Sequence, residues 1–597
     1  MGASRPAFSI LTDHQFVASG SWFHVVPVRA PALPPGGGTS RPGSCACASG
    51  ATRLRASAYR EDRVSPTGPS PDLVEYAFTD VGPWVVERGD LVWLRGIDRI
   101  RARTRADVPR LLARRRLPPI GRFARVVTSL GVALAGWRLR DRGTQKSRAG
   151  LSRRLRQSFE SLGSTYVKLG QIISAFDGLF PDELVEEFKR LRDQVPAEPF
   201  EAVKALVESE LGRPLEAVFA EFAREPIAAA SIAQVHAARL VTGEDVVVKV
   251  QRPRVGALVR EDLRALAWLA PLLVGRIPVS ALANPPALVE LFAEQIVEEL
   301  DFRLEAENML DLAHVFAATD QRTMVVPRPH ATLVTRRVLV MERLHGFAFD
   351  DVASMHASGI DTDAVLRAGL IACLEGALFY GVFHGDLHGG NLLVAPGGQT
   401  VVFDFGITGR LAEPQRLAFL RLLLSGTAGD VRGQVEALRD LGAFPSDTDI
   451  DAVMVDLGLD LPVQDPTQMS ADELVGELQD LMKKLLGYGA RAPKDLMLFV
   501  KNLMFLNAAT ATLAPDLDLL AEIVHIHTYF LTHHGERIAR ELGEGAVPLT
   551  VDLDAVKAGM MVPVEVERLT FRDLQERRRT IIKRMGDANG RGGRSSG

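Results

Sequence analysis

The spacing of apolar residues predicts a long helical region followed by a mixed α and β region. Apolar side chains recur at three- and four-residue steps through residues 151–195, which predicts helix with one apolar face. The stripe consists of Leu155, Phe159, Leu162, Tyr166, Leu169 and Ile173. The same periodicity predicts helices over residues 286–316, 366–380 and much of 411–534.

Valine-rich runs predict strands between these helices. Residues 227–250 predict a strand, a loop and two strands joined by a turn, and residues 338–342 predict a further strand. Residues 392–394 and 400–403 predict a hairpin across a Pro-Gly-Gly turn. The pattern therefore predicts an α+β fold in which a small lobe with an antiparallel sheet is joined, near Glu342, to a mainly helical large lobe.

Composition divides the chain into six expected segments. Residues 30–70 are rich in Pro, Gly, Ser and Arg and lack apolar periodicity, which is typical of disorder. The segments are a disordered or mis-annotated extension at 1–100, a basic segment suited to a membrane surface at 101–150, a helical extension at 151–225, a small lobe at 226–343, a large lobe at 344–535, and a partly disordered tail at 536–597.

The bulk composition excludes several classes of protein. With 47% hydrophobic and 24% charged residues among 597, the chain has the composition of a globular protein. The net charge of −4 gives no reason to expect a nucleic-acid partner. Three cysteines exclude a disulfide scaffold, so a reducing, cytoplasmic compartment is expected.

Positive charge is nevertheless concentrated in one segment. Residues 101–156 carry 17 Lys and Arg against two acids, Asp107 and Asp141. Such a segment favours anionic lipid surfaces, although a solvated arginine-rich face explains it equally well. The longest apolar run there, residues 126–137, is shorter than the roughly 20 residues that span a bilayer. We therefore predict no transmembrane helix, and peripheral attachment to a membrane is a hypothesis.

The strongest chemical signal is the segment His-Gly-Asp-Leu-His-Gly-Gly-Asn at 384–391. It is followed by Asp-Phe-Gly at 404–406, so that Asp386, Asn391 and Asp404 have the spacing of a kinase-type phosphoryl-transfer site. Asp386 can accept a proton from an attacking hydroxyl or orient water, and the oxygens of Asn391 and Asp404 suit Mg²⁺. The predicted hairpin would hold both metal ligands.

A lysine in a valine run is the second signal. Lys249 ends the run Val-Val-Val-Lys at 246–249, and a buried ammonium is costly unless it is paired. In kinases such a lysine holds the α and β phosphates and pairs with a helix glutamate. The helix predicted at 286–316 offers Glu294, Glu298, Glu299, Asp301 and Glu305.

Together these residues resemble the UbiB family of ADCK-type atypical kinases, which are linked to ubiquinone biosynthesis. The resemblance covers residues 150–520. It is carried by Lys-Leu-Gly-Gln at 168–171, the alanine-rich loop at 228–236, the lysine strand, Glu-Leu-Asp at 299–301 with Glu305, and the two catalytic motifs. It implies a protein-kinase-like fold with a family-specific N-terminal helical extension, and it implies ATP and Mg²⁺ as cofactors.

The resemblance also implies a role for each motif residue. Asp386, Lys249 and Glu305 would be catalytic, and Asn391 and Asp404 would hold the metal. ATP would contact Ala229, Ala230, Ser231, Lys249, Met341 and Glu342. The residues Lys168, Gly170, Gln171, Glu299 and Asp301 would lie over the active site, with Lys168 near Glu299 and Asp301.

Some positions depart from the family pattern. Gly385, Leu387 and Gly389 stand where members commonly have Ala, Pro and Pro, and Ala233 replaces a usual Gly. The altered loop is similar to that of aminoglycoside-type phosphotransferases, which share His-Gly-Asp-Leu-His. The departures leave Asp386 intact, so they bear on the phosphate acceptor rather than on nucleotide chemistry.

The segment after Asp-Phe-Gly bears on the acceptor too. Residues 407–414 run directly into a predicted helix, without a long activation loop or an Ala-Pro-Glu anchor. Water, a lipid or a small molecule is therefore a better acceptor than a peptide. The leading hypothesis is an ATP- and Mg²⁺-dependent kinase or ATPase that supports quinone or isoprenoid-lipid metabolism at a membrane surface.

Other functions remain open at this point. The protein could be a non-catalytic nucleotide-binding scaffold, or a small-molecule phosphotransferase of the aminoglycoside type; a conventional Ser/Thr kinase fits least. Expected partners are ATP, an anionic lipid or an isoprenoid or quinone precursor, and enzymes of quinone biosynthesis.

Overall fold

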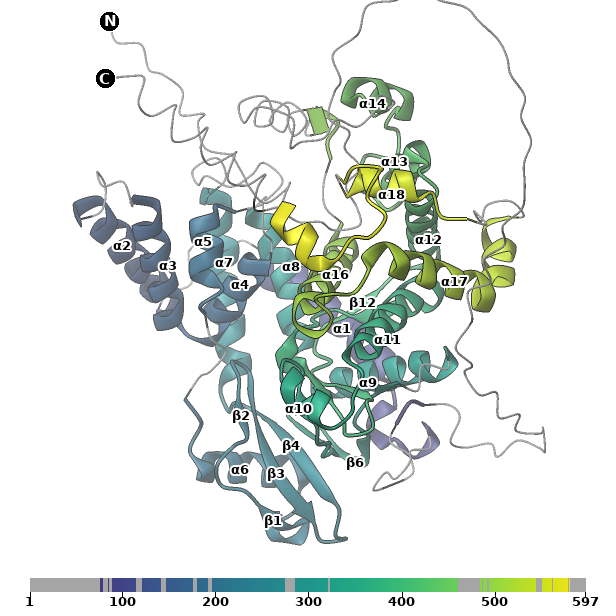
Figure 1. The fold of residues 1–597 in the computed structure, drawn as a ribbon. Coiled ribbons are helices and arrows are strands. Elements are labelled where there is room, and N and C mark those ends of the chain that lie inside the picture. The colour runs from purple at the N-terminus through teal and green to yellow at the C-terminus, as the bar shows by residue number, and fades with distance from the viewer. Residues whose placement is uncertain are drawn as a thin grey trace, which may run out of the picture.

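Two lobes and a group of N-terminal helices make up the protein (Figure 1). The computed structural model describes residues 76–579 with internal gaps, the longest at 274–284 and 460–483. The N-terminal helices are α1 (Ile97–Leu112), α2 (Arg122–Arg140), α3 (Ser147–Leu162), α4 (Ser164–Ala175) and α5 (Asp182–Phe188). The apolar stripe predicted for 151–195 is thus divided between helices, because Gly163 has a left-handed φ of 97° where α3 ends.

The smaller lobe is built on an antiparallel sheet with the order β1-β3-β4-β7-β6, and β2 pairs with β3. Its elements are α6 (Phe200–Leu211), β1 (Phe219–Phe222), β2 (Ala228–Ala229), β3 (Ala233–Leu240), β4 (Asp245–Gln251), α7 (Val255–Leu273), α8 (Pro285–Glu298), α9 (Phe302–Ala318), β6 (Pro329–Val334) and β7 (Val338–Glu342). The sheet begins seven residues before the expected lobe boundary at 226.

Alternation along β4 decides where its lysine lies. Val246, Val248 and Val250 are buried in the core that includes residues of α6. Val247 belongs to the core on the opposite side of the sheet, together with residues of α9. Because side chains alternate along a strand, Lys249 shares the face of Val247 and is directed toward α9.

The single helix predicted at 286–316 is wrong, since the structure has two helices there. α8 ends at Glu298 and α9 begins at Phe302. Asp301 between them has extended backbone angles, and its carboxylate accepts a hydrogen bond from the backbone N–H of Arg303. A side-chain cap of this kind starts a new helix, and it leaves Glu299 in the break between the two.

The expectation of disorder across residues 1–100 is wrong for residues 88–100. These residues form two short 3₁₀ turns, Arg88–Asp90 and Val92–Leu94, and then α1. Trp93 is buried, and its indole N–H donates to the carbonyl of His330 at 3.2 Å. Residues 1–75 lie outside the described part of the chain.

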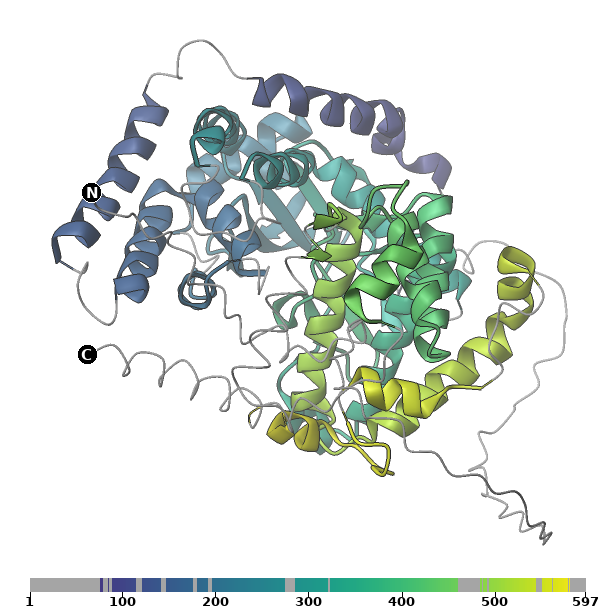
Figure 2. The same cartoon turned by 90° about the horizontal axis from the view of Figure 1, so that it is seen from above.

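α1 is attached to the smaller lobe by ion pairs. Arg101 lies 2.5 Å from a carboxylate oxygen of Glu307 and 3.4 Å from one of Glu298, and Arg105 also pairs with Glu298 at 2.8 Å. Seen from above, α1 runs along one side of the molecule and α2 along another (Figure 2). Part of the basic segment therefore neutralises acidic residues within the protein.

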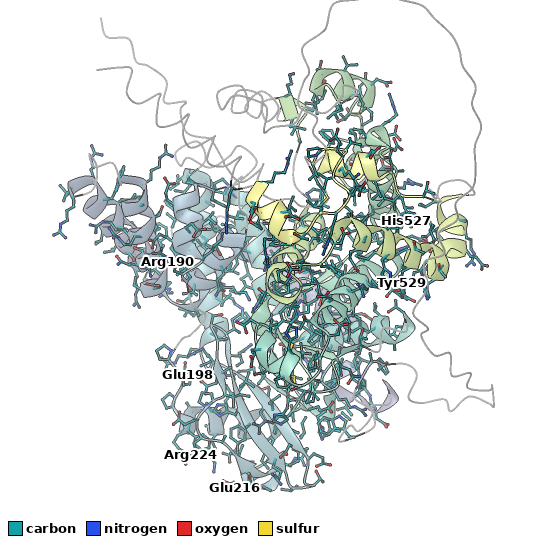
Figure 3. The ribbon with its side chains drawn as sticks, viewed as in Figure 1. Arg190, Glu198, Glu216, Arg224, His527 and Tyr529 are labelled. Carbon is teal, nitrogen blue, oxygen red and sulfur yellow. The ribbon has the colours of Figure 1, made fainter. Side chains whose placement is uncertain are left out.

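The larger lobe is mainly helical and encloses a small sheet. Its elements are β8 (Phe347–Ala348), α10 (Val352–Ala357), α11 (Thr362–Glu375), the π-helical turn Gly376–Tyr380, β9 (Val382–His384), β10 (Leu392–Val394), β11 (Thr400–Val402), β12 (Thr408–Arg410), α12 (Glu413–Thr427), α13 (Val431–Asp440), α14 (Ile450–Leu457), α16 (Lys494–Leu513), α17 (Leu519–Leu542) and α18 (Leu553–Gly559). A short strand of the preceding segment, β5 (Met324–Val325), pairs with β11. Figure 3 labels His527 and Tyr529 on α17 and Arg224 and Glu216 in the smaller lobe.

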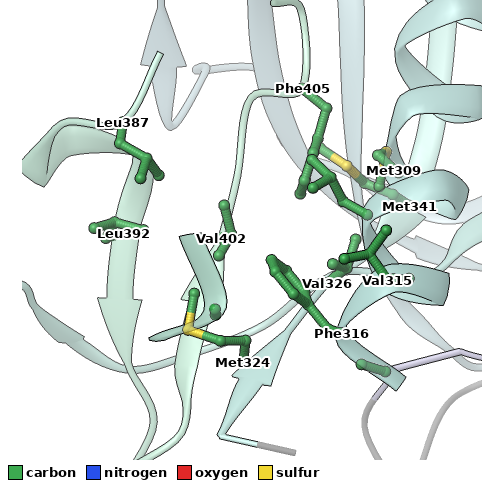
Figure 4. Packing of buried hydrophobic residues seen from close by; sticks show 14 of the residues in the cluster. Met309, Val315, Phe316, Met324, Val326, Met341, Leu387, Leu392, Val402 and Phe405 are labelled. Carbon is green, nitrogen blue, oxygen red and sulfur yellow. The ribbon is translucent and has the colours of Figure 1, made fainter. Parts of the chain in front are cut away.

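The predicted hairpin is present as β10 and β11, with Leu392 paired to Val402 and Val394 to Thr400. Leu392, Val394 and Val402 of the hairpin pack in one core that also includes Met309 of α9 and Phe405 (Figure 4). The hairpin therefore shares a core with residues of both lobes.

One helix in the described part of the chain is long and apolar enough to cross a membrane by length and composition, Asp495–Leu513 within α16. Phe499 and Asn502 of this helix are fully buried. The helix packs against α11 and contacts β12. It is therefore a core helix of the larger lobe.

Candidate active site

A cleft of about 1000 Å³ lies between the lobes and is lined by residues of both lobes and of α4. The predicted site residues in its walls are Lys168, Gln171, Ala230, Lys249, Glu305, Met341, Glu342, Asp386, Asn391 and Asp404. Gly170, Ala229, Ser231, Glu299 and Asp301 are absent from that lining set.

Lys249 joins two carboxylates across the cleft. Its ammonium is 2.6 Å from Oε1 of Glu305 on α9 and 3.2 Å from Oδ1 of Asp404. Burial alone would lower the pKa of Lys249, but the charges of Asp404 and Glu305 outweigh it and raise that pKa. Lys249 is thus a permanent cation positioned where phosphate oxygens could replace or join its carboxylate partners.

Asp404 and Asn391 fit a Mg²⁺ site. Asp404 has a left-handed φ of 54°, and although burial would raise its pKa, Lys249 and Lys168 keep that pKa well below its usual range. Asn391 donates through Nδ2 to the backbone carbonyl of Asp386 at 3.1 Å, so its Oδ1 remains as the atom that could bind a metal. One carboxylate and one amide oxygen match the few protein ligands that Mg²⁺ takes beside phosphates and waters.

The His384 ring forms hydrogen bonds to two backbone segments of the site. Its Nε2 lies 3.1 Å from the carbonyl oxygen of Phe403 and 3.0 Å from that of Asp404, while its Nδ1 accepts from the backbone N–H of Asp386. These partners require a neutral ring protonated at Nε2, and burial correspondingly lowers the pKa of His384. The ring therefore ties the backbone at Asp386 to the backbone at Asp404.

Two functional candidates, Lys501 and Asn502 of α16, were missed in the sequence analysis. Lys501 forms an ion pair with Oδ1 of Asp386. Asn502 is fully buried, donates to the carbonyl of His384, and accepts from the backbone N–H of Leu387 at 3.2 Å. In the sequence these two residues appear only as a Lys-Asn pair inside an apolar helical stretch. Their role could not be inferred from it, because the loop they contact is more than a hundred residues away.

The residues at 385 and 387, which differ from the family pattern, are explained by their neighbours in the structure. A proline at 387 would lack the N–H that Asn502 accepts. A Cβ on Gly385 would lie 2.6 Å from Cγ2 of Ile407, closer than side chains tolerate. Both substitutions are thus matched to neighbours in this chain.

The helix α4 places a second lysine at the site. Lys168 lies 3.1 Å from Oε1 of Glu299, and burial raises the pKa of Glu299 to about 7 despite this pairing. A Cβ on Gly170 would come within 2.3 Å of a Leu191 methyl group, so glycine allows α4 to pack closely on the residues after α5. Gln171 faces the cleft.

Asp301 pairs with Arg303, whereas the sequence had placed it near Lys168. Its two carboxylate oxygens accept from the guanidinium of Arg303 at 2.9 and 2.6 Å, in addition to capping α9. Its neighbour Glu299 is the one that meets Lys168.

Arg252 holds the alanine-rich loop through hydrogen bonds to backbone carbonyls. Arg252 donates to the carbonyl of Ala230 at 2.9 Å and to that of Pro196 at 2.9 Å. Ser231 in the loop is buried.

On the hinge, the Glu342 carboxylate accepts a hydrogen bond from the backbone N–H of Arg328, so the Glu342 side chain contacts the smaller lobe.

The segment after Asp-Phe-Gly is short and fixed. Asn308 of α9 donates to the carbonyl of Phe405 at 2.8 Å. Arg410 donates to Oδ1 of Asn308 at 2.8 Å and to Asp311 at 2.6 Å. Strand β12 pairs with β9, and α12 begins three residues later at Glu413, so this segment offers no extended loop for a peptide.

The fold and the arrangement of these residues define an atypical kinase. The model of the ABC1 atypical kinase-like domain matches residues 190–438. An uncharacterized protein of Mycobacterium tuberculosis is 35% identical over 387 residues, which cover 62% of this chain and 76% of that protein. The chain belongs to the ABC1/UbiB/ADCK family of atypical kinases, and the two-lobed kinase-like fold expected from the sequence is confirmed.

Two further relatives, of 33% and 31% identity, agree with this assignment. An aarF domain-containing protein kinase of Arabidopsis thaliana, described as chloroplastic, is 33% identical over 395 residues, 62% of this chain and 73% of the relative. The probable protein kinase UbiB of Marinobacter nauticus is 31% identical over 376 residues, 61% and 67% respectively. A Mycobacterium tuberculosis protein solved as a complex with erythromycin matches with 20% identity and a TM-score of 0.34, over 58% of this chain and 91% of the other.

Proposed function

We propose that this protein is an ATP- and Mg²⁺-dependent kinase or ATPase that acts on a lipid or small molecule of quinone or isoprenoid metabolism at a membrane surface. The observation that carries the proposal is Lys249, paired with both Glu305 and Asp404 in a cleft that also contains Asp386 and Asn391. Membership of the family supports nucleotide use.

Each side chain would have a distinct task. Lys249, oriented by Glu305, would hold the α and β phosphates, and the adenine would lie between the loop at Ala229–Ser231 and the hinge at Met341 and Glu342. Asn391 and Asp404 would hold Mg²⁺, which supplies neutralisation of the phosphate charge.

Asp386 would position the nucleophile rather than act as a strong base. Burial would raise the pKa of Asp386, but Lys501 and Lys168 outweigh it and lower that pKa. A carboxylate that is ionised at all relevant pH values accepts a hydrogen bond from a hydroxyl or water well, yet takes up a proton poorly. Its contribution would therefore be mainly orientation of the attacking oxygen.

The acceptor is proposed to be small or lipidic. α4 contributes Lys168 and Gln171 to the cleft wall, and Arg410 and Asn308 fix the segment on which a protein kinase would dock a peptide. The names of the relatives describe probable protein kinases, so phosphorylation of a protein is the competing outcome.

Phosphate release by the full chain tests the proposal, with and without Mg²⁺ and anionic liposomes, beside Asp404→Asn. Turnover that needs Mg²⁺, increases with lipid and disappears in the variant is expected. Nucleotide binding without phosphate release under every condition would favour the scaffold function instead. Phosphorylated product from a panel of hydroxylated small molecules would favour the phosphotransferase function.

A further inference from the structure

A second cavity, of about 650 Å³, lies outside the cleft and is lined with arginines. Its walls come from α1, α7, the junction of α8 and α9, and the turn between β6 and β7. The arginines are Arg103, Arg110, Arg260, Arg264, Arg303 and Arg336. The volume is in the range of small-ligand sites.

The acidic residues of the cavity do not balance this charge. Its two carboxylates are Asp107 and Asp301. The Asp301 carboxylate accepts two hydrogen bonds from the Arg303 guanidinium, and Asp107 forms an ion pair with Arg110 at 3.3 Å. Four arginines are left over in a cavity whose remaining polar lining residue is a threonine.

Three of the four arginines form no ion pair with a carboxylate within the described part of the chain. The guanidinium groups of Arg264 and Arg336 have no hydrogen-bond or ion-pair partner among the described residues. Arg260 donates only to the carbonyl of Gly256 in its own helix at 2.9 Å. Burial, followed by the charges of Arg336 and Arg264, lowers the pKa of Arg260, which indicates that these guanidinium groups lie close enough to repel one another.

Apolar side chains line the same cavity. Ile100, Leu111, Val297 and Leu300 contribute to its walls. A bare inorganic ion would use only the arginines, whereas a phosphate ester with a short apolar part would use both kinds of wall. Guanidinium groups bind phosphate oxygens through two parallel N–H···O bonds, and several of them in one cavity suit a ligand with more than one negative charge.

We infer that this cavity is a binding site for a phosphate- or diphosphate-bearing ligand, held by Arg260, Arg264 and Arg336. The site is separate from the nucleotide cleft, because none of these arginines lines the cleft. The ligand could be the headgroup of a phospholipid or a free phosphorylated metabolite, and the two share the chemistry that the arginines recognise. The inference is independent of the proposed function, since its test measures binding alone.

Calorimetric titration of the full chain with inorganic pyrophosphate, without Mg²⁺, tests the site. The pocket variant is Arg264→Ala/Arg336→Ala. The matched control is Arg138→Ala/Arg140→Ala, which removes the same charge from exposed arginines of α2. A third variant, Lys249→Ala, removes the phosphate-binding lysine proposed for the cleft.

The expected result is binding to the wild type, to the α2 control and to Lys249→Ala, with affinity at least tenfold weaker in the pocket variant. The single variant Arg336→Ala, at an exposed position, guards against misfolding and should weaken binding in the same direction. Equal affinity in the pocket variant and the α2 control, or loss of binding only in Lys249→Ala, would overturn the inference.

Cosedimentation separates the two sources of phosphate. Vesicles of phosphatidylglycerol in phosphatidylcholine should bind less of the pocket variant than of wild type, and pyrophosphate should compete, if a lipid headgroup enters the cavity. If the pocket variant binds vesicles as well as the wild type does but binds pyrophosphate more weakly, the site belongs to a soluble phosphorylated ligand. If the pocket variant binds both vesicles and pyrophosphate as well as the wild type does, the inference is wrong.

Discussion

Lys501 on α16 forms an ion pair with Asp386 of the catalytic loop, across 115 residues of sequence. The neighbouring Asn502 fastens the same loop through His384 and Leu387. α16 thus supplies both the charge beside Asp386 and the hydrogen bonds that fix the backbone of its loop. The catalytic loop is not a self-contained motif in this protein.

Removing the cation beside Asp386 should change both the rate and its pH dependence. Lys501→Met should lower kcat for ATP turnover about 10- to 100-fold, with a smaller effect on KM for ATP. Without Lys501, which lowers the pKa of Asp386, that pKa should rise, so the acid limb of the kcat profile should move to higher pH. Lys501→Arg keeps the charge and should keep the wild-type limb; an unchanged limb in Lys501→Met would exclude this role.

Lys249→Met tests the central ion-pair network. The change removes the cation shared by Glu305 and Asp404, and turnover should fall about 10²- to 10³-fold because phosphate charge is no longer stabilised. Glu305→Gln retains the lysine and should lose less. Steady-state phosphate release measures both, and a Lys249→Met protein with wild-type turnover would contradict the proposed mechanism.

Glu299 predicts an unusual dependence of stability on pH. Burial raises its pKa from 4.5 to about 7, so between these values the folded protein keeps a proton that the unfolded chain has lost. The stability contributed by neutral Glu299 is complete below the lower value and is lost as pH rises through about 7.

Glu299→Gln stays neutral and should escape that loss. Relative to wild type, its free energy of unfolding should therefore rise by up to about 3 kcal/mol between pH 5 and pH 8. Urea titrations at the two pH values measure this difference, with Glu221→Gln, an exposed change on β1, as the control. A difference that is the same at both pH values would show that Glu299 does not titrate in this range.

The packing of Gly385 against Ile407 predicts a coupled pair of substitutions. Gly385→Ala should destabilise the protein by about 1–3 kcal/mol, because the new methyl group meets Cγ2 of Ile407. In Gly385→Ala/Ile407→Ala the contact is relieved, so the cost should be less than the sum of the two single changes. Additive effects in chemical denaturation would show that the glycine is not required by this contact.

The sequence predicted features that depend on local pattern. A continuous run of valines placed Lys249 on a strand, and the Pro-Gly-Gly turn predicted the hairpin of β10 and β11, both of which are present. The family and the kinase-like fold followed from motif order and are confirmed. The roles of Asp386, Asn391 and Asp404 stay predictions.

Features that depend on distant contacts could not be read from the pattern. The break between α8 and α9 comes from a single cap at Asp301, which looks like any other acid in a helical run. Lys501 and Asn502 have meaning only once α16 lies against the catalytic loop. Trp93 is held by a hydrogen bond to the carbonyl of His330, far along the chain, so the sequence pattern did not distinguish its segment from the residues before it.

The short bridge through Asn308 has a consequence for control of the enzyme. Asn308 donates to the backbone carbonyl of Phe405, and Arg410 donates to Asn308, so contacts within the protein hold the segment between Phe405 and Arg410 in place. Arg101 of α1 donates to the same Asn308 oxygen at 3.0 Å. Because these contacts already hold the segment, phosphorylation would not be needed to order it. The activity of the enzyme would be set by what is admitted to the cleft, and α1 rather than an activation loop is the element whose displacement would disturb it.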